Sequence, residues 1–244
     1  MSAPVPRTRG PHFFCDPVEG GSATLRGGDA HHLARVLRAA PGDPVSLADG
    51  TGGLYQARVT AAGPDLVHCA VTERFVVAPP RPALTVVHAL PKGRKLDEVV
   101  TRLSEVGVDR LLPVHSERSQ VVLRGDRAAR AVTRWRAVAL AAAKQARRVR
   151  PLEVGPVGEW TGAFAGARGI VLWEEADAAL PAVLAGVGGA DELVLAVGPE
   201  GGLTADEVAA TGLPAARLGP TILRTETAAL VAAGVVLAAV GRFG

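Results

Sequence analysis

Hydrophobic and polar residues alternate over short runs in the first 75 residues, a spacing typical of strands with one buried face. Three runs share this alternation: 44–48, 54–60 and 66–72. Clusters of Gly, Pro and Asp separate the runs and indicate turns. A short helix is expected at 29–38, with Asp29 as its N-cap. The pattern predicts a small β-barrel that carries one helix, in a first domain of residues 1–77.

A proline-rich stretch at 78–82 disfavours both helix and central strand and therefore predicts a linker. Beyond it, apolar runs of strand length alternate with amphipathic helical segments. The expected strands are 84–90, 110–114, 169–173, 192–197 and 215–218, and the expected helices are 94–107, 126–148, one starting at 205, and 225–241. This order predicts an α/β domain over residues 83–244, with a parallel sheet covered by helices on both faces.

The formal net charge of +3 is unevenly distributed along the chain. Residues 79–150 contain 16 basic and 6 acidic side chains, whereas residues 151–244 contain 4 and 11. A basic segment of this size attracts polyanions, so nucleic acid is an expected partner. Exposed helices also carry charges of one sign, which leaves a solvated surface as the alternative. Aromatic residues make up only 4% of the chain, which favours phosphate and shape recognition over base stacking.

Several other function classes lose support from the sequence. No apolar run reaches the roughly 18 residues that span a bilayer, and the first residues lack a signal-peptide pattern, so we expect a cytoplasmic protein without a membrane partner. Cys15 and Cys69 have no metal-ligand or redox spacing, and we expect reduced thiols and no metal site. No phosphate loop or dinucleotide fingerprint is present, which disfavours nucleoside triphosphate and NAD chemistry.

Ligands bind parallel sheets at the carboxyl ends of the strands, and two loops there carry candidate chemistry. The loop after 192–197 consists of Gly198, Pro199, Glu200, Gly201 and Gly202. Its glycines allow a ligand to approach the backbone, and the following helix offers free N–H groups. An ordinary strand-to-helix turn is the alternative interpretation.

The loop after 215–218 places Arg224 between apolar residues and a helix start. An arginine at the edge of a buried strand needs an anionic or carbonyl partner, which a ligand or Glu226 could supply. We expect the two loops to follow neighbouring strands and thus to line one crevice.

Basic residues near strand ends and helix ends are candidates for contact with nucleic acid. The candidates are Arg35, Arg38, Lys92, Arg94, Lys95, Arg118, Arg147 and Arg148. Arg127, Arg130 and Arg134 share one helical face, but that face is equally consistent with a solvated surface.

The motifs GPEGGLTADEV (198–208) and LGPTILRTETAAL (218–230) closely resemble those of the RsmE-type RNA methyltransferase family. Further similar segments are 31–43, 92–119 and 142–151, so the resemblance covers nearly the whole chain. It implies a PUA-like N-terminal barrel followed by a SPOUT domain with a C-terminal trefoil knot. It also implies a homodimer that uses S-adenosylmethionine (SAM), releases S-adenosylhomocysteine, and methylates N3 of one uridine in 16S ribosomal RNA or the small ribosomal subunit.

Site residues follow from the same resemblance. The residues implied to hold SAM are Leu172, Gly198, Pro199, Glu200, Gly201, Leu218, Gly219, Ile222 and Leu223. Glu200 is a candidate general base for the N3 proton, and Arg224 is a candidate for stabilising charge on a uracil oxygen. Alternatively, Arg224 holds a phosphate and Glu200 only shapes its loop. The chain has Ala141 where the family usually has an acid, which removes that carboxylate from consideration.

Two other functions stay open at this point. A related SPOUT methyltransferase acting on another ribosomal position or on transfer RNA would have similar cofactor loops. A non-enzymatic RNA-binding assembly factor would explain the basic segment equally well, but not the two glycine-bearing loops.

Overall fold

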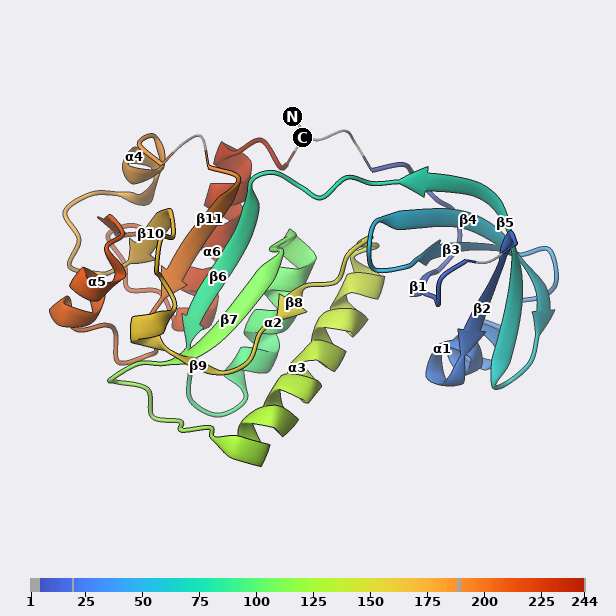
Figure 1. Ribbon diagram of the computed structural model, residues 1–244, viewed down its shortest axis with the longest axis horizontal. Coiled ribbons are helices and arrows are strands. Elements are labelled where there is room, and N and C mark those ends of the chain that lie inside the picture. The colour runs from blue at the N-terminus through green and yellow to red at the C-terminus, as the bar shows by residue number, and fades with distance from the viewer. Residues whose placement is uncertain (1–4, 19, 188–189, 244) are drawn as a thin grey trace. The chain divides into compact units, whose positions relative to one another are not determined.

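The computed structural model describes residues 5–18, 20–187 and 190–243, and the chain forms two compact units (Figure 1). One unit contains Pro80–Ala142 and the chain from Leu152 onward. The other contains the described residues before Pro80 together with Ala143–Pro151. Residues 77–82 form neither helix nor strand, as expected for a linker. The sequence had assigned residues 143–151 to the second domain, whereas their contacts group them with the first.

The N-terminal unit is built on a five-stranded sheet with the order β1-β3-β4-β5-β2. Its strands are β1 (His12–Phe14), β2 (Ser22–Arg26), β3 (Pro44–Ala48), β4 (Gly53–Ala62) and β5 (Leu66–Val76). β1 pairs with β3 in parallel and the other pairs are antiparallel. Along β4, Tyr55, Ala57 and Val59 are buried while Arg58 and Thr60 are exposed, as the alternation predicts, but Leu54 on the second face is buried as well.

The predicted helix at 29–38 is shorter and less regular than expected. It consists of α1 (Gly27–His31) and a π-helical turn, η1 (His32–Val36). The prediction that Asp29 is the N-cap is wrong, because Arg26 occupies that position and Asp29 lies in the first turn. The Asp29 carboxylate instead binds Nζ of Lys144 at 2.6 and 2.8 Å, an ion pair that joins residues 115 positions apart.

A series of hydrogen bonds links the start of the N-terminal unit to residues 147–148, and two of its members, His12 and Ser46, are buried. His12 donates from Nε2 to the carbonyl of Arg148 at 2.9 Å, so its Nδ1 must accept from Ser46 Oγ at 2.7 Å. Ser46 Oγ in turn accepts from Thr8 Oγ1 at 2.6 Å, and Arg147 donates to Thr8 Oγ1 at 3.2 Å. Each donated hydrogen in this series of bonds then has one acceptor, which requires the neutral Nε2–H tautomer of His12.

The second unit contains a parallel sheet with the order β12-β10-β11-β6-β7-β8, and β9 also pairs with β7. Its strands are β6 (Ala83–Ala89), β7 (Arg110–His115), β8 (Glu153–Val154), β9 (Gly158–Glu159), β10 (Gly169–Leu172), β11 (Glu192–Val197) and β12 (Ala215–Ala216). Its helices are α2 (Lys95–Val106), α3 (Gly125–Gln145, which ends in the other unit), α4 (Leu180–Leu184), α5 (Ala205–Thr211) and α6 (Thr225–Ala239), with a 3-10 turn, η2 (Trp160–Gly162).

Successive residues of the central strands point into two separate hydrophobic cores. Leu193, Leu195 and Val197 of β11 face the core shared with α2, α3 and α6. Val194 and Ala196 face the opposite core, which contains residues of α5 and η2. The predicted parallel sheet with helices on both faces is therefore confirmed.

Two expectations about this unit need correction. β11 and β12 are not neighbours, because β10 lies between them and pairs with both. The helix predicted to end at Arg148 ends at Gln145, where the backbone turns and Arg147 adopts a left-handed φ of 53°. Hydrophobic periodicity reports neither the lateral pairing of the strands nor the backbone angles that end the helix.

Within the described parts of the chain, none of the helices is long and apolar enough to cross a membrane. In the same residues, no three His, Cys, Asp or Glu side chains group in a way that could hold a metal ion. Cys69 is a buried free thiol, and burial raises its pKa to about 11.

The buried His12 predicts that the N-terminal unit loses stability below neutral pH. Burial lowers the pKa of His12 beneath its ordinary value of 6.5, so only the unfolded chain takes up a proton as the pH falls through 6.5. We expect the melting temperature to be highest above about pH 7 and to fall toward pH 5. Thermal unfolding of His12→Gln should show a weaker pH dependence than the unsubstituted protein. The exposed His68 offers a control, since His68→Gln should retain the full dependence; equal profiles for both variants would contradict the assignment.

Candidate functional site

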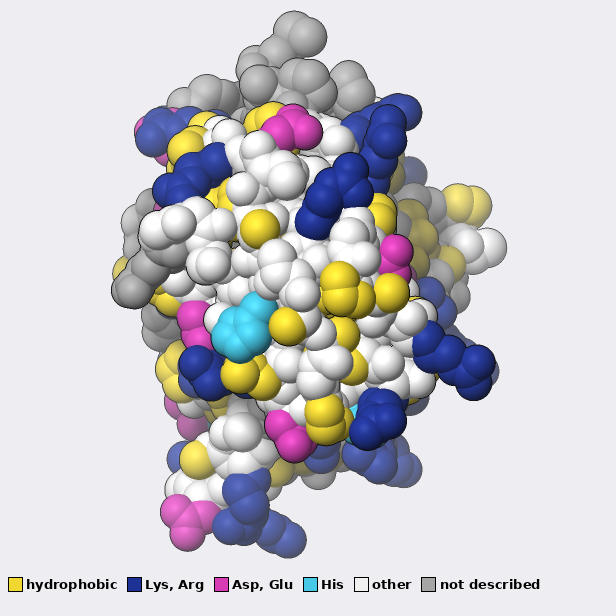
Figure 2. All heavy atoms as spheres, turned by 90° about the vertical axis from the view of Figure 1, so that its right-hand side faces the viewer, with side chains coloured by type: hydrophobic (Ala, Val, Ile, Leu, Met, Phe, Trp, Pro, Cys, Tyr) yellow, Lys and Arg dark blue, Asp and Glu magenta, His cyan; other side chains and the backbone are white. Residues whose placement is uncertain are grey.

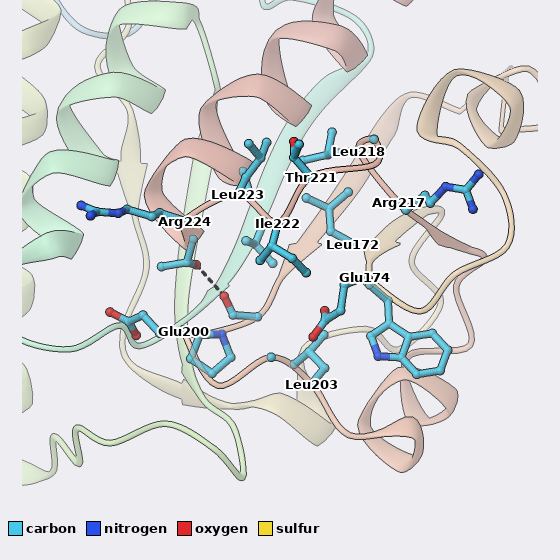
Figure 3. A pocket seen from close by; sticks show the side chains of 18 of the residues that line it. Leu172, Glu174, Glu200, Leu203, Arg217, Leu218, Thr221, Ile222, Leu223 and Arg224 are labelled. Carbon is cyan, nitrogen blue, oxygen red and sulfur yellow. Dashed lines mark hydrogen bonds between the residues drawn. The ribbon is translucent and has the colours of Figure 1, made fainter.

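A cavity of about 630 Å³ lies at the carboxyl ends of β10, β11 and β12 (Figure 3). The loops after these three strands form its walls, and the start of α6 closes one side. Because β10 lies between the other two strands, its own loop forms the middle of the cavity. Eight of the nine residues implied to bind a cofactor line it: Leu172, Gly198, Pro199, Glu200, Leu218, Gly219, Ile222 and Leu223.

The remaining predicted residue, Gly201, does not line the cavity. Its carbonyl accepts a hydrogen bond from Arg118 Nη1 at 3.0 Å, and a Cβ at this position would lie 3.2 Å from Cβ of Arg118. Gly201 thus permits close contact with the loop after β7, which also explains why Arg118 is held by protein and is not free.

The bend after β11 requires glycine for two reasons. Gly202 has a φ of 71°, which L side chains rarely adopt, and a Cβ there would lie 2.5 Å from Oε1 of Glu174. The predicted capping box then starts α5: Thr204 accepts from the backbone of Glu207, and Glu207 accepts from the backbone of Thr204. Glu207 also accepts from the backbone of Glu117 at 2.7 Å, which fixes the loop after β7 to the same helix.

Thr225 joins the two glycine-bearing loops. Its Oγ1 donates to the carbonyl of Gly198 at 2.6 Å and lies 3.3 Å from Nε2 of His88. The His88 ring is fully buried, and its Nδ1 donates to the carbonyl of Ala89 at 2.7 Å. Burial lowers the pKa of His88, so the ring is neutral near pH 7.

Glu200 is held by positive charge and backbone donors. Its Oε1 lies 2.8 Å from Nζ of Lys95, and its two oxygens accept from the backbone N–H of Lys92 at 3.1 and 3.2 Å. Partial burial raises the pKa of Glu200, but these hydrogen bonds outweigh it and leave the pKa below its ordinary value. Glu226 Oε2 lies 3.8 Å from the same Nζ, buried and without a hydrogen-bond partner among the described residues.

Arg224 is exposed and occupies the N-cap position of α6. Among the residues that the structure describes, its guanidinium has no hydrogen-bond or ion-pair partner. The alternative in which Glu226 holds Arg224 is therefore not seen, because Glu226 faces Lys95 instead. Figure 3 shows Arg224 and Glu200 on one side of the cavity and Glu174 on the other, with Ile222 between.

Sequence reasoning missed two residues of the middle loop. Trp173 and Glu174 directly follow β10 and line the cavity. Nε1 of Trp173 is buried without a hydrogen-bond partner within the described residues, and the Glu174 carboxylate has no partner there either. Their position directly after a buried parallel strand was the signal that could have identified them. Arg217 also lines the cavity, but its guanidinium donates to the carbonyls of Ala176 and Asp177.

The candidate nucleic-acid contacts are not equally available. Arg147 donates to the carbonyls of Gly10 and Thr8 at 2.8 Å each, so its guanidinium is occupied by the N-terminal unit. Four of the candidates are exposed: Arg35, Arg38, Lys92 and Arg94. Lys95 pairs with Glu200, and Arg148 is half-buried. On the face in Figure 2, lysine and arginine side chains lie around the edges and do not gather in one patch.

Two glycines of the cavity should respond differently to the same substitution. In Gly198→Ala the new Cβ would lie 2.8 Å from Cγ of the buried Leu203, whereas Gly219→Ala meets nothing within 4 Å. We expect Gly198→Ala to lower the free energy of unfolding by about 1–3 kcal/mol, as overpacking does. Gly219→Ala should change it by less than about 0.5 kcal/mol. Urea denaturation of both variants checks this. Equal stabilities would show that the Leu203 side chain moves to make room for the new Cβ without a cost in free energy.

Comparison with known proteins is consistent across the chain. An RNA methyltransferase domain family matches residues 79–237, and an RNA methyltransferase PUA domain family matches residues 25–72. Ribosomal RNA small subunit methyltransferase E of Mycobacterium tuberculosis is 39% identical over 239 residues, covering 92% of this chain and 90% of its own. The protein of the same name from Bacillus subtilis is 29% identical over 228 residues, covering 88% and 89%.

A solved structure is similar over almost the full length. Ribosomal RNA small subunit methyltransferase E from Neisseria gonorrhoeae, bound to S-adenosylmethionine, superposes with a TM-score of 0.84 at 27% identity. The match covers 96% of this chain and 99% of that one.

Proposed function

This chain belongs to the RsmE-type family of RNA methyltransferases, and from that premise we propose that it transfers a methyl group from SAM to N3 of one uridine in 16S ribosomal RNA. The observation that supports this most strongly is the cavity at the carboxyl ends of β10, β11 and β12, beside an arginine whose guanidinium has no partner among the described residues. The relatives act on small-subunit ribosomal RNA by name, which supports the substrate class. Such a substrate would place the protein in the cytoplasm.

The cavity residues fit the chemical groups of SAM. Leu172, Leu218, Ile222 and Leu223 offer apolar surface to an adenine ring and a methionine chain. The exposed carboxylate of Glu174, which has no partner among the described residues, offers an acceptor for the polar groups of the cofactor. The open space beside Gly219 lets a ligand approach the backbone there. When bound, SAM supplies an electrophilic methyl group on a sulfonium.

The chain path around β12 supports the trefoil knot implied by the family resemblance. β12 pairs with β10 on one side, and Arg217 bridges Ala179 in parallel on the other. β10 and Ala179 both belong to the segment that leads from β10 to β11, so β12 runs inside the loop that this segment forms. The chain then continues to α6, which packs against α2, β6 and β11. Knots are rare in proteins, and periodicity in the sequence gives no sign of one.

The surroundings of Arg224 and Glu200 suit the two residues to different roles in methyl transfer. Methylation at N3 requires loss of the N3 proton, which leaves negative charge on the uracil carbonyl oxygens. The exposed guanidinium of Arg224 is suited to stabilise that charge at the cavity mouth. Glu200 is a weak base, because Lys95 and the backbone of Lys92 hold its pKa low. Its contacts favour a role in orienting Lys95 and the first turn of α2 over proton removal.

The target uridine must be unpaired or flipped out, because N3 lies on the base-pairing edge. The exposed Lys92 and Arg94 lie beside the cavity and are suited to contact phosphates near the target. The PUA-like unit, with its exposed Arg35 and Arg38, would hold more distant parts of the RNA by shape.

A homodimer is part of this proposal, and the apolar outer face of α6 supports it. Glu226 is the only charged residue between Thr225 and Ala239, yet one side of this helix is exposed or half-exposed. The residues on that side are Leu230, Val231, Gly234, Val235 and Ala238. An apolar helix face of this kind needs a partner, and a second copy supplies one by two-fold symmetry.

Arg224→Ala is expected to reduce methylation by roughly 10²- to 10³-fold, because one preorganised charge-stabilising donor is lost. SAM affinity, measured by calorimetry, should change little, since the side chain points away from the apolar lining. Arg224→Lys retains the charge and should recover part of the rate at saturating RNA. Unchanged turnover in Arg224→Ala would remove this residue from the mechanism.

Val231→Glu is expected to convert a dimer to a monomer, because it places a charge in the apolar face of α6, where Val231 is 41% exposed. Light scattering after size exclusion measures the mass directly. Val76→Glu is the control, since Val76 is 89% exposed on β5 and should leave the assembly intact. A monomeric unsubstituted protein would overturn the dimer proposal.

Mass spectrometry of small-subunit RNA from a strain that lacks this protein tests the function itself. We expect one uridine to lose a methyl group at N3 and to regain it when the gene is restored. Loss of methylation in transfer RNA or in the large subunit would favour a related SPOUT enzyme instead. A chain that fails to bind SAM in calorimetry would favour a non-enzymatic assembly factor.

A further inference from the structure

A second cavity of about 490 Å³ lies between the start of α2 and the first half of α3. Four arginines line it: Arg94, Arg127, Arg130 and Arg134. Its floor is apolar and includes Leu96, Leu123 and Trp135. We call this feature the arginine groove.

The charges of the arginine groove are only partly neutralised by the protein. Asp97 binds Arg134 at 3.0 Å and Arg94 at 3.3 Å, and its Oδ1 also accepts from Nε1 of Trp135 at 3.0 Å. Arg127 and Arg130 are exposed and have no ion-pair or hydrogen-bond partner among the described residues. Asp97 pairs with two of the four guanidinium groups, and none of the described residues that line the groove is acidic, so the groove keeps a net positive charge. Asp97 anchors two of them, which sets their positions in advance of any ligand.

The arginine groove shares a wall with the cavity at the carboxyl ends of β10, β11 and β12. Arg94 and Leu96 line the groove, while Lys95, between them in the sequence, lines the other cavity. The same short segment is fixed to the cavity by the backbone of Lys92, which donates to Glu200. A polymer that enters one cavity can therefore continue into the other across a single turn of chain.

We propose that the arginine groove binds the phosphates of the RNA strand next to the nucleotide that enters the cavity. This deepens the proposed function and rests on it. Arg127 and Arg134 are separated by about 10 Å along the helix axis, so the three arginines of α3 can contact more than one phosphate in a row. Arginine pairs with phosphate oxygens in a bidentate manner, and the apolar floor accommodates sugar or base surface. Continuity with the cavity favours RNA over an acidic protein segment as the occupant.

The double substitution Arg127→Ala and Arg130→Ala tests the groove, because it removes the two arginines that have no partner in the described parts of the chain and leaves the contacts of Asp97 intact. With the holo protein and small-subunit RNA, we expect KM for RNA to rise while kcat at saturating RNA and SAM affinity are retained. The slope of log affinity against log salt should fall by about 1.4, since each phosphate contact on a single strand contributes about 0.7. The charge-preserving pair Arg127→Lys and Arg130→Lys should keep most of the slope.

Arg102→Ala with Arg110→Ala is the matched control. It removes the same charge from exposed arginines of the same unit that pair with Glu105 and Glu153 outside the groove. The control should keep the slope and KM of the unsubstituted protein. If the groove variant and the control lose the same amount, the effect is one of net charge and the groove proposal fails. An unsubstituted protein that does not methylate the RNA would refute the proposed function instead, and tight binding of an acidic peptide in competition with RNA would favour a protein ligand.

Discussion

The hydrogen bond from Thr225 Oγ1 to the carbonyl of Gly198 is the contact on which the geometry of the site depends. Thr225 is the first residue of α6 and Gly198 directly follows β11, so one bond joins the two loops that face each other across the cavity. Thr225 is buried and the bond is partly buried, so loss of the hydroxyl would remove the side-chain donor of the Gly198 carbonyl. The short distance of 2.6 Å leaves little freedom to either loop.

Hydrophobic periodicity predicted most of the parallel sheet, because buried strands and amphipathic helices each have a recognisable pattern of apolar residues in the sequence. β6, β7, β10 and β11 agree with expectation to within one residue at each end. The lateral order of the strands has no such pattern in the sequence. Ile170 and Leu195 are equally apolar in the sequence, and their alignment across β10 and β11 comes from hydrogen-bond pairing. β12 has only two residues, so the sequence pattern could not predict its pairing with β10.

The candidate site was predicted unevenly for a related reason. Glycine, proline and charged residues in a loop identify a bend, but the direction of each side chain depends on individual backbone angles. The left-handed φ of Gly202 turns the bend so that Gly201 meets Arg118 and leaves the cavity lining. Trp173 and Glu174 lack any glycine signal and were missed, although they follow a buried strand directly. Strand ends are therefore at least as informative as loop composition in this fold class.

The basic segment divides into arginines that the fold uses and arginines that it leaves free. Arg147 holds the N-terminal strand region, and Arg136 donates to the carbonyl of Val154 at 2.9 Å. Such guanidinium groups replace water by fixed protein acceptors and are not available to a polyanion. Arg224, Arg127 and Arg130 have no acceptor among the described residues and are exposed. The net charge does not distinguish arginines bound by the protein from arginines without an acceptor. The RNA-binding surface is therefore inferred from the partners of each arginine and not from the size of the basic segment.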